Sequence, residues 1–485
     1  MCGILGIYNT IEFDNKKIKE LLEKIQHRGQ ESYGISYTFN DNINNLKFNG
    51  KIKDLPNFKS NSIIAHTRYS TSGKSKKVDL NKKDNFNEEI QPFVGYHKEL
   101  GVFSLVHNGN IPYNTYNENI KKFVINEKKY YNYFLKKNEN IEFLSDTHMI
   151  LKFIESFDFN YFKNNIDIDR DYKWTLILKQ ILNIFKKAYC FIVLTNDNMY
   201  IMRDKYSVRP LSIGFNESGW CVASESIVFD NNYNFMRNIK QGEILSLNKN
   251  GVKTLFLYKN NDNTQISAHC LFEYIYFLKE NTYSDGFHVS ELRYHFGLEL
   301  ANQDIIENNI IKNAIVVGTP STGIPSGKGY ADQTNLPYIQ VLKKDVNLGR
   351  TFILENNKKR DNACKKKYYL DIDKIKNKKI IIVDDSLVRG TTIKNLIRMF
   401  KENGSQEVHV RIAAPPIKHA CYYGIDIPNK EELIANNLII EQIKNIIEAD
   451  SLNYLSLNDI KKIMKDKFNN LCTGCFNNNY NDIDW

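Results

Sequence analysis

Two adjacent carboxylates, Asp384 and Asp385, follow a short apolar run at residues 380–383. Such a run of β-branched residues is typical of a strand buried on both faces of a parallel sheet. A hydroxyl-rich turn at residues 386–392 leads into a helix period that Gly404 is expected to close. The apolar positions of this helix are Ile393, Leu396, Ile397 and Phe400. Backbone N–H groups at a helix start bind phosphate, and carboxylates bind sugar hydroxyls or a divalent cation. The pattern favours a ribose phosphate site; a βα turn whose acids only cap the helix is the alternative.

The whole string VDDSLVRGTT resembles the phosphoribosylpyrophosphate (PRPP) loop of the type I phosphoribosyltransferases. The resemblance implies an α/β domain of this type in the second half of the chain. It implies that Asp384 and Asp385 meet the ribose hydroxyls or Mg²⁺. It also implies that the loop after them holds the 5-phosphate of PRPP, through Ser386, Arg389, Gly390, Thr391 and Thr392.

A second chemical signal stands at the start of the chain, where Cys2 follows Met1. Removal of the initiator methionine would make Cys2 the first residue. Its α-amino group titrates near neutrality and would serve as the base for its own thiol. Further along, Asn108 and Gly109 place a side-chain amide next to a backbone N–H, a pair able to hold a developing oxyanion. The alternatives are an incidental strand cysteine and a hairpin turn at Asn-Gly.

The elements that must position these residues follow from the apolar periodicity of the chain. The expected strands are residues 3–8, 63–70, 101–110 and 314–318. Residues 16–27 predict a helix with one apolar face, formed by Ile18, Leu21, Leu22 and Ile25. Ser145 is expected to cap a helix that begins at Asp146. The rest of residues 113–174 reads as solvated covering structure.

Four strings in the first half, MCGILGIY, QHRGQESYGI, AHTRYSTSG and VHNGN, resemble the class II glutamine amidotransferases. That family has an α+β fold, an αββα sandwich with an N-terminal nucleophile, and it splits glutamine to glutamate and ammonia through a thioester. The resemblance implies that Cys2 is the nucleophile and that Asn108 and Gly109 form the oxyanion hole.

The same resemblance implies which residues hold the glutamine substrate. Arg68 corresponds to the family arginine that binds the α-carboxylate, a role that suits the planar fork of its guanidinium. Asp146 corresponds to the residue that accepts the α-ammonium group. Arg28 matches a family arginine beside the nucleophile and is expected to support it, with a purely structural loop arginine as the alternative.

A turn rich in Gly, Pro, Ser and Thr follows the expected strand at residues 314–318. This composition suits close approach of the backbone to a pyrophosphate. By family resemblance, Thr322 helps to bind the Mg-pyrophosphate. The chain departs from the family pattern at Ser321, where the family has an acidic residue, and at Gly323, where it has serine. Both changes bear on metal affinity.

Residues 343–371 contain the string GRTFI and many basic side chains without a clear period. This favours a lid that closes over a polyanion, and an ordinary solvated loop is the alternative. By resemblance, Lys344 and Arg350 are PRPP-binding residues. The family pattern differs from this chain at Val346 and Asn347, so the closed contacts of such a lid are expected to differ.

Taken together, the motifs of both halves resemble the amidophosphoribosyltransferase family, in its cluster-bearing branch. The implied reaction converts glutamine, PRPP and water to 5-phosphoribosylamine, glutamate and pyrophosphate, the first committed step of purine biosynthesis. The implied domains are a glutaminase at residues 2–260, a phosphoribosyltransferase at 268–470 and a tail at 471–485. Purine nucleotide feedback inhibitors and a homotetramer are implied by the resemblance alone. A non-catalytic, cluster-carrying regulatory paralogue is the alternative.

Cys472 and Cys475 form a CxxC pair, a spacing that suits one metal ion or cluster. In the cluster-bearing branch, cysteines at four positions ligate a [4Fe–4S] cluster, and these positions correspond to Cys270, Cys421, Cys472 and Cys475. Zinc and buried thiols without a ligand role are the alternatives. Cys190 and Cys221 read as core thiols.

The composition of the chain sets outer limits on its function. Its 485 residues exceed what one core usually supports, so two large domains are expected. The net charge is +10, but the basic residues are dispersed, which favours an anionic small substrate over nucleic acid. No apolar run approaches the ~18 residues of a membrane span, and the first residues leave no room for a signal peptide. We therefore expect a cytoplasmic protein that binds neither nucleic acid nor a membrane.

Overall fold

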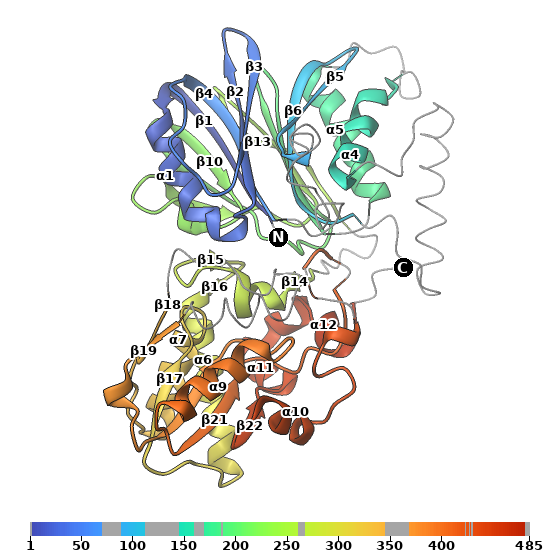
Figure 1. Ribbon diagram of the computed structural model, residues 1–485. Helices are drawn as coiled ribbons and strands as arrows, with labels where there is room; N and C mark the ends of the chain where they lie inside the picture. The colour runs from blue at the N-terminus through green and yellow to red at the C-terminus, as the bar shows by residue number, and fades with distance from the viewer. Residues whose placement is uncertain are drawn as a thin grey trace. The chain divides into compact units, whose positions relative to one another are not determined.

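The computed structural model describes residues 2–69, 89–111, 145–159, 169–185, 188–259, 267–344, 368–421, 423–425, 427 and 430–480. The chain separates into two compact units (Figure 1). The first unit comprises Met1–His269, Tyr422–Asp426 and Asp482–Trp485. The second comprises Cys270–Cys421 and Ile427–Asn481.

The first unit is built on two antiparallel sheets. The strands of one sheet are β1 (Gly3–Asp14), β2 (Ser32–Phe39), β3 (Asn42–Asn49), β4 (Lys59–Arg68), β9 (Ser212–Asn216), β10 (Gly219–Ala223) and β11 (Asn234–Asn238). Their order is β11-β9-β10-β1-β4-β2-β3. The strands of the other are β5 (Phe93–His97), β6 (Gly101–Gly109), β7 (Tyr189–Leu194), β8 (Met199–Arg203), β12 (Glu243–Asn248) and β13 (Gly251–Leu257). Their order is β13-β12-β8-β7-β6-β5.

Helices cover the outer faces of these two sheets (Figure 1). Helix α1 (Asn15–Ile25) buries Ile18, Leu21, Leu22 and Ile25, the four residues that its apolar period predicts. Helices α4 (Asp146–Ser156) and α5 (Arg170–Ile184) pack on the second sheet. A third apolar cluster fills the space between the sheets. The arrangement is the αββα sandwich that the sequence predicts.

Helix α5 corrects one expectation. The region up to Trp174 reads as solvated covering structure, yet Trp174 is fully buried at the centre of the core under the second sheet. The helix also buries Ile177, Leu178, Ile181 and Leu182. Its apolar residues do keep a helical spacing, but the Lys- and Asn-rich residues before them dilute that signal.

The second unit is built on a parallel sheet. Its strands are β17 (Ala314–Gly318), β20 (Lys379–Asp384), β21 (Glu407–Ile412) and β22 (Ser451–Tyr454), and they pair in this order. A single parallel bridge joins Val316 to Tyr338. In β20 every residue from Ile380 to Val383 is fully buried, as expected for a strand with both faces covered.

The helices of the second unit cover both faces of this sheet. They are α6 (Val289–Ile306), α7 (Gly323–Thr334), α9 (Thr391–Glu402), α10 (Ile440–Ile447), α11 (Leu457–Met464) and α12 (Gly474–Asn477). Helix α7 packs on α6, β17 and β20, whereas α9 packs on β21 and α10. The chain leaves β17 towards the bridge at Tyr338 but leaves β20 in the opposite direction, towards β21. Because such crossovers are right-handed, α7 and α9 cover opposite faces. The carboxyl ends of β17 and β20 therefore border the crevice where α/β sheets bind ligands.

Short elements complete the two units. The 3₁₀-helices are η1 (Gln26–Arg28), η7 (Ser226–Val228), η10 (Ile372–Lys374), η11 (Lys430–Glu432) and η12 (Lys465–Asn470), and η8 (Glu273–Phe277) is a π-helix. Three pairs of short strands are β14 (His269–Cys270) with β23 (Leu471–Cys472), β15 (Tyr283–Ser284) with β16 (Phe287–His288), and β18 (Leu342–Lys344) with β19 (Tyr368–Leu370).

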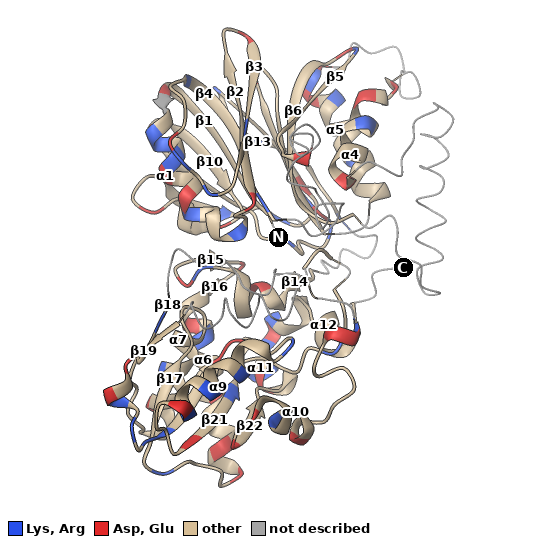
Figure 2. Cartoon of the chain, in the orientation of Figure 1, with Lys and Arg blue, Asp and Glu red and all other residues tan. Residues whose placement is uncertain are grey.

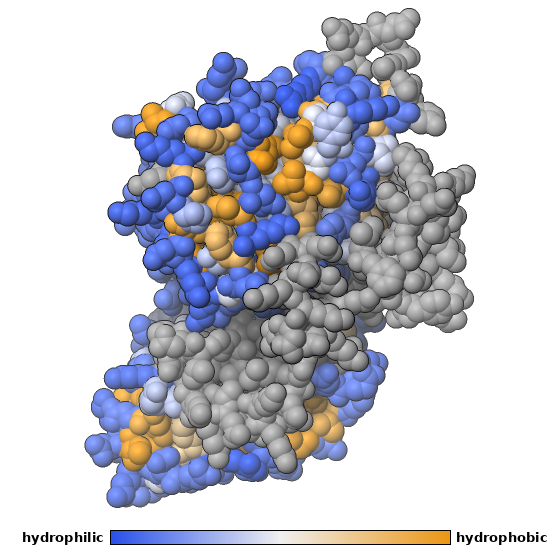
Figure 3. Space-filling view, turned by 45° about the horizontal axis from the view of Figure 1, so that its top comes forward, coloured by the Kyte–Doolittle hydropathy of each residue, from blue (hydrophilic) through white to orange (hydrophobic). Residues whose placement is uncertain are grey.

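Charged residues of both signs are interspersed along the elements of both units (Figure 2). On the face shown in Figure 3, hydrophobic residues are mixed with hydrophilic ones. This pattern agrees with the dispersed basic residues of the sequence. Among the described residues, no helix is both long and apolar enough to cross a membrane.

Candidate active sites

The first candidate site lies where strand ends of the first unit face the space between its two sheets. Side chains alternate along a strand, so residues an even number apart share a face. Ile64 belongs to the cluster between the sheets, which places Arg68 on the inner face of β4. Val106 of the same cluster places Asn108 on the inner face of β6. The predicted carboxylate-binding and oxyanion residues therefore come from opposite sheets and face the same space.

Cys2 stands at the start of β1, next to β4. Gly3 pairs with Thr67, so Cys2 lies one register position further along, beside Arg68. The Cys2 thiol is half-buried and lies 3.5 Å from the carbonyl oxygen of Tyr69. A side chain at position 3 would not fit, because a Cβ there would meet Thr67 Oγ1 at 2.6 Å. The glycine after Cys2 thus allows the close strand approach that sets the thiol in place.

Asn108 and Gly109 end strand β6. The Asn108 side chain is 1% exposed, and neither its amide nitrogen nor its amide oxygen has a hydrogen-bond partner in the described part of the chain. A buried amide without partners costs free energy, and this cost fits a group kept for a substrate oxygen. Gly109 is also required, because a Cβ there would lie 2.2 Å from the carbonyl oxygen of Ala188.

Arg68 forms ion pairs within the protein. Its Nη2 lies 2.5 Å from Glu89 Oε2 and its Nη1 lies 3.8 Å from Glu31 Oε2. Two protein carboxylates therefore surround the guanidinium. A glutamine α-carboxylate would share the guanidinium with Glu89 or displace it, a competition that no local sequence pattern reveals.

Asp146 is fixed at the start of α4. Ser145 caps the helix, and its side chain accepts a hydrogen bond from the backbone N–H of His148, as predicted. The Asp146 carboxylate accepts hydrogen bonds from the backbone N–H groups of Ile111, at 3.1 Å, and Thr147, at 2.8 Å. It thereby fastens the chain that leaves Gly109 to helix α4. Asp146 is thus a structural anchor next to the candidate oxyanion residues.

Two further residues of this region escaped the sequence analysis. His66 shares the inner face of β4 with Arg68; it is fully buried, and neither ring nitrogen has a hydrogen-bond partner among the described residues. Burial, together with the positive charge of Arg68, lowers its pKa well below the usual range, so the ring is neutral. His66 lies two residues before Arg68 in an expected strand, and this spacing could have predicted that the two side chains share a face. No such signal existed for Glu225, which is fully buried beside Arg28.

The second candidate site lies at the carboxyl ends of β17 and β20. Asp384 Oδ1 accepts a hydrogen bond from the Thr319 hydroxyl at 2.5 Å. Asp385 accepts hydrogen bonds from the hydroxyls of Ser386, at 2.6 Å, and Thr322. The structure therefore brings the two predicted acids together with the predicted pyrophosphate residue Thr322. Thr319 was not predicted.

The turn after Asp385 ends at the first residue of helix α9. Gly390 caps the helix with a left-handed backbone (φ 80°), and Thr391 and Thr392 occupy its first turn. Their backbone N–H groups stand at the positive end of the helix dipole, which favours a phosphate. Arg389 forms an ion pair with Glu432, its Nη2 lying 2.5 Å from the carboxylate. The Arg389 guanidinium therefore binds a carboxylate of the protein itself in this structure.

Gly323 is explained by the packing of this site. A Cβ at position 323 would lie 2.3 Å from Thr319 Oγ1 and 2.5 Å from the carbonyl oxygen of Val383. The Thr319 hydroxyl therefore reaches Asp384 through space that a serine at position 323 would fill. Ser321 is exposed in the same turn. The departure at Gly323 is thus coupled to a hydroxyl that binds the first acid.

The predicted lid falls largely outside the described residues. Lys344 pairs with Tyr368 through the β18–β19 ladder, but its side chain is not described. Arg350, Val346 and Asn347 lie outside the described residues, so their predicted roles remain predictions.

The four cysteines assigned to a cluster all belong to the second unit. Cys270, Cys472 and Cys475 are buried and Cys421 is half-buried. Burial raises the pKa of the Cys475 thiol well above the usual range, and the neighbouring Cys421, Cys270 and Cys472 raise it further. Cys421, Cys270 and Cys472 therefore lie within electrostatic range of Cys475. Among the described residues, however, no group of three or more His, Cys, Asp or Glu side chains is arranged so that it could hold a metal ion.

The other two described cysteines behave as predicted. Cys190 and Cys221 are fully buried in the first unit, and burial raises the pKa of both thiols. They are core residues.

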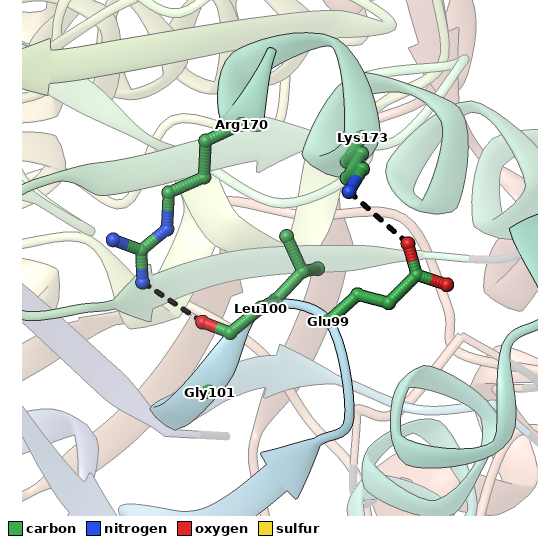
Figure 4. A pocket seen from close by; sticks show the side chains of 5 residues that line it. All are labelled: Glu99, Leu100, Gly101, Arg170 and Lys173. Carbon is green, nitrogen blue, oxygen red and sulfur yellow. Dashed lines mark hydrogen bonds and ion pairs between the residues drawn. The ribbon is translucent and has the colours of Figure 1, made fainter. Parts of the chain in front are cut away.

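A hollow of about 400 Å³ in the first unit is lined by Glu99, Leu100, Gly101, Arg170 and Lys173 (Figure 4). Its polar groups are engaged with one another: Lys173 Nζ lies 3.1 Å from Glu99 Oε2, and Arg170 donates a hydrogen bond to the Leu100 carbonyl at 2.8 Å. It contains no residue of either candidate site.

Comparison with known proteins settles the family. Residues 298–436 match the family described as phosphoribosyl transferase domain. The amidophosphoribosyltransferase of Methanothermobacter thermautotrophicus is 33% identical over 494 residues, covering 99% of this chain and 94% of the relative. The Bacillus subtilis amidophosphoribosyltransferase is 31% identical over 490 residues, which cover 99% of this chain and 94% of the relative. The solved structure of glutamine PRPP amidotransferase from B. subtilis, complexed with ADP and GMP, gives a TM-score of 0.81 at 30% identity and covers 99% of this chain and 97% of that chain.

The chain belongs to the amidophosphoribosyltransferase family.

Membership of the amidophosphoribosyltransferase family confirms the main prediction from the sequence. The chain is a glutamine-dependent phosphoribosyltransferase of the first step of purine biosynthesis. The predicted fold is confirmed as well, because the similar solved structures combine a glutaminase domain with a phosphoribosyltransferase domain.

Proposed function

We propose that the two candidate sites divide the amidophosphoribosyltransferase reaction between them. Glutamine is split at Cys2 in the first unit, and the ammonia released displaces pyrophosphate from C1 of PRPP at Asp384 and Asp385 in the second. The observation that carries this division is the placement of the two residue sets. Each set lies within one unit, the first between two sheets and the second at the carboxyl ends of two parallel strands.

At the first site, the α-amino group of Cys2 takes the thiol proton, and the sulfur attacks the carboxamide carbon of glutamine. The oxyanion that forms accepts hydrogen bonds from the Asn108 amide and the Gly109 N–H. The protonated amino group then gives its proton to the leaving nitrogen, so ammonia and a thioester result. Water hydrolyses the thioester to glutamate and restores the thiol. The buried, partnerless amide of Asn108 supports this role.

Binding of glutamine rests on two further side chains. Arg68 attracts the α-carboxylate and Asp146 the α-ammonium group, since each carries the opposite charge. Arg28 supports Cys2, because its Nε donates a hydrogen bond to the Cys2 carbonyl at 3.0 Å.

At the second site, the protein mainly positions PRPP and stabilises charge. The carboxylates of Asp384 and Asp385 accept hydrogen bonds from the ribose hydroxyls. The loop from Ser386 to Thr392, with Gly390 and Thr391, holds the 5-phosphate at the start of α9. Arg389 joins this set by turning from Glu432 to the phosphate. On the family resemblance, Lys344 and Arg350 also bind PRPP.

Magnesium fits the second site. The carboxylates of Asp384 and Asp385 and the Thr322 hydroxyl are hard oxygen donors of the kind that Mg²⁺ prefers, and the structure holds them together. When bound, Mg²⁺ neutralises charge on the pyrophosphate leaving group.

We propose that the four cysteines hold a [4Fe–4S] cluster, on the family resemblance, with zinc as the alternative. The support from the structure is that Cys475 is buried near Cys421, Cys270 and Cys472, whose charges act on its thiol. Cys270, Cys421, Cys472 and Cys475 would hold such a cluster through their thiolates.

Regulation and assembly follow from the relatives. The similar B. subtilis structure was solved with ADP and GMP, which supports purine nucleotides as feedback inhibitors of this chain. A homotetramer rests on family resemblance alone.

The deciding experiment measures pyrophosphate release from PRPP, with glutamine or ammonium as the nitrogen donor, on protein purified without oxygen. Wild type should use both donors. Cys2→Ala should lose the glutamine reaction and keep the ammonium reaction, because only the first site needs the thiol. If wild type releases no pyrophosphate with either donor, the chain is a regulatory paralogue. If Cys2→Ala still uses glutamine, the assignment of the nucleophile is wrong.

A further inference from the structure

Glu225 is a charged residue that the reaction described above does not use. Its side chain is 0% exposed. Glu225 Oε1 accepts a hydrogen bond from Arg28 Nη1 at 2.6 Å and lies 2.7 Å from His27 Nε2. Removing one partner of such a buried pair leaves an uncompensated charge, which is costly. The unit keeps this ion pair in its interior, next to the start of β1.

The position of Glu225 follows from the β1–β10 ladder. Leu5 pairs with Ala223. Ser224 extends the pairing, since its N–H donates to the Ile4 carbonyl and its hydroxyl accepts from the Ile4 N–H, both at 3.0 Å. Glu225 is the next residue and thus arrives beside the first residues of β1.

Arg28 connects Glu225 to Cys2. Its guanidinium is fully buried at the end of η1, and it donates in two directions: Nε to the Cys2 carbonyl at 3.0 Å and Nη1 to Glu225. The guanidinium is planar and rigid, so fixing one edge fixes the other. The Cys2 carbonyl is therefore connected, through one rigid group, to a carboxylate two residues after the end of β10.

We propose that Glu225 is a positioning residue of the glutamine site. By holding Arg28, it fixes the Cys2 carbonyl and with it the α-carbon from which both the thiol and the α-amino group extend. The thiol nucleophile and the α-amino base are both attached to that carbon, so a shift of the Cys2 α-carbon displaces both groups at once. The inference rests on the proposed role of Cys2 as the nucleophile.

The test is Glu225→Gln in the full-length protein, purified without oxygen. Glutamine keeps the size of the side chain and removes the charge that orders Arg28. A displacement of about 1 Å in a reacting group can cost about 100-fold in rate, so we expect kcat for glutamine hydrolysis to fall by about 10- to 100-fold. The KM for glutamine should stay within about threefold, and ammonium-dependent pyrophosphate release should be unchanged.

Glu243→Gln is the matched control. Glu243 is buried in the same unit and pairs with Arg237 through two contacts, at 2.7 and 2.9 Å. None of its contacts in the described part of the chain involves Cys2 or Arg28. The control variant should lower the urea midpoint about as much as Glu225→Gln does, yet leave kcat for glutamine unchanged. Equal losses of kcat in both variants would reduce Glu225 to a stabilising residue and overturn the inference.

A double variant tests whether Glu225 acts through Arg28. Arg28→Met removes both donors at nearly constant length. Since the two residues act in series, Arg28→Met/Glu225→Gln should be no slower than Arg28→Met alone. Multiplicative losses in the double variant would overturn the series arrangement.

Two outcomes need separate readings. If Glu225→Gln does not fold, Glu225→Asp replaces it, because the charge remains while the shorter side chain withdraws from Arg28; wild-type kcat in that variant would reject the inference. If Cys2→Ala keeps the glutamine reaction, the proposed function fails first. If Cys2→Ala loses the glutamine reaction as expected but the Glu225 variants keep full activity, only the present inference is rejected.

Discussion

Single residues in the PRPP site show how a departure from the family pattern can be compensated nearby. Gly323 lacks the hydroxyl that the family pattern would supply, but it leaves room for Thr319, which donates to Asp384. A hydrogen bond from a hydroxyl to an ionised carboxylate contributes roughly 1.5–3 kcal/mol. The serine hydroxyl of the family pattern is therefore absent at position 323, and the Thr319 hydroxyl is present instead. It is hydrogen-bonded to Asp384, which meets the ribose in the proposed site.

Gly323→Ala is expected to weaken this site. The added Cβ would meet Thr319 Oγ1 at 2.3 Å and the Val383 carbonyl oxygen at 2.5 Å, and the latter is backbone that cannot turn away. We expect the KM for PRPP to rise by about tenfold, equivalent to about 1.4 kcal/mol. The KM is measured from steady-state pyrophosphate release with ammonium as the nitrogen donor.

Lys328→Ala is the control for Gly323→Ala, because Lys328 is exposed on the same helix and should leave the KM for PRPP unchanged. An unchanged KM in Gly323→Ala would mean that α7 shifts without disturbing Asp384, and the coupling described above would be wrong.

The sequence predicts individual site residues only where a local motif carries them. Asp384, Asp385 and Asn108 stand in short strings, and the structure sets them at strand ends as expected. Glu225 and Thr319 stand in no such string, because their roles arise from partners far along the chain. Glu225 meets a residue 197 positions away, and Thr319 one that is 65 away. The two carboxylates around Arg68 were unpredictable for the same reason.

At the scale of elements, prediction works where one helix or strand carries its own complete pattern. Helix α9 buries the four residues that its period predicts, and Gly404 follows it with a left-handed backbone (φ 91°). The strand expected at residues 314–318 is β17. Helix α5 was missed because its apolar face follows a long polar segment. Tyr423 and Gly424 join the first unit through tertiary contacts with Arg209 and Asn110.

An ion-pair cluster joins α9 to the end of α10. Glu448 lies 3.1 Å from Lys394 Nζ and 2.5 Å from Arg398 Nη2. These cations lower the pKa of the Glu448 carboxyl to about 2, Arg398 contributing most. Because the folded pKa is depressed, the stabilisation is present above the unfolded pKa of about 4.3 and is lost as the pH falls towards 2.

Glu448→Gln should therefore lower stability at pH 7 and have little effect near pH 2.5. The carboxylate is well exposed, so the expected loss at pH 7 is only about 0.5–1 kcal/mol. Urea unfolding at both pH values, in low salt, measures the difference. Glu441→Gln is the control, since Glu441 forms a single exposed pair with Lys444 and should change stability less. A loss that persists unchanged at pH 2.5 would contradict the electrostatic explanation.

At the scale of the whole molecule, the four cysteines tie together distant parts of one unit. Cys270 begins the second unit, Cys421 precedes the excursion into the first, and Cys472 and Cys475 lie near its end. A cluster on these thiols would close loops of about 150 and 50 residues, which constrains the unfolded chain much as disulfides do.

Loss of the cluster should destabilise the second unit. We expect air-oxidised protein, or Cys475→Ser, to lose about 2–5 kcal/mol of unfolding free energy relative to protein purified without oxygen. Iron content, visible absorbance and the urea midpoint are measured on the same samples. Cys221→Ala serves as the control, because its thiol lies in the core of the first unit and should not alter iron content. If protein purified without oxygen contains no iron, the assignment of a cluster to these cysteines is wrong.

The short excursion of the chain into the first unit also has a consequence for protein synthesis. Arg209 donates a hydrogen bond to the Tyr423 carbonyl, and Gly424 packs so closely that a Cβ there would lie 2.5 Å from Asn110 Cβ. Residues up to 269 leave the ribosome well before residue 425, by roughly 8–30 s at ordinary elongation rates. During that interval the segment after Gly109 lacks its final neighbour. A nascent chain therefore completes the unit proposed to split glutamine only after most of the unit that would consume the ammonia has been made.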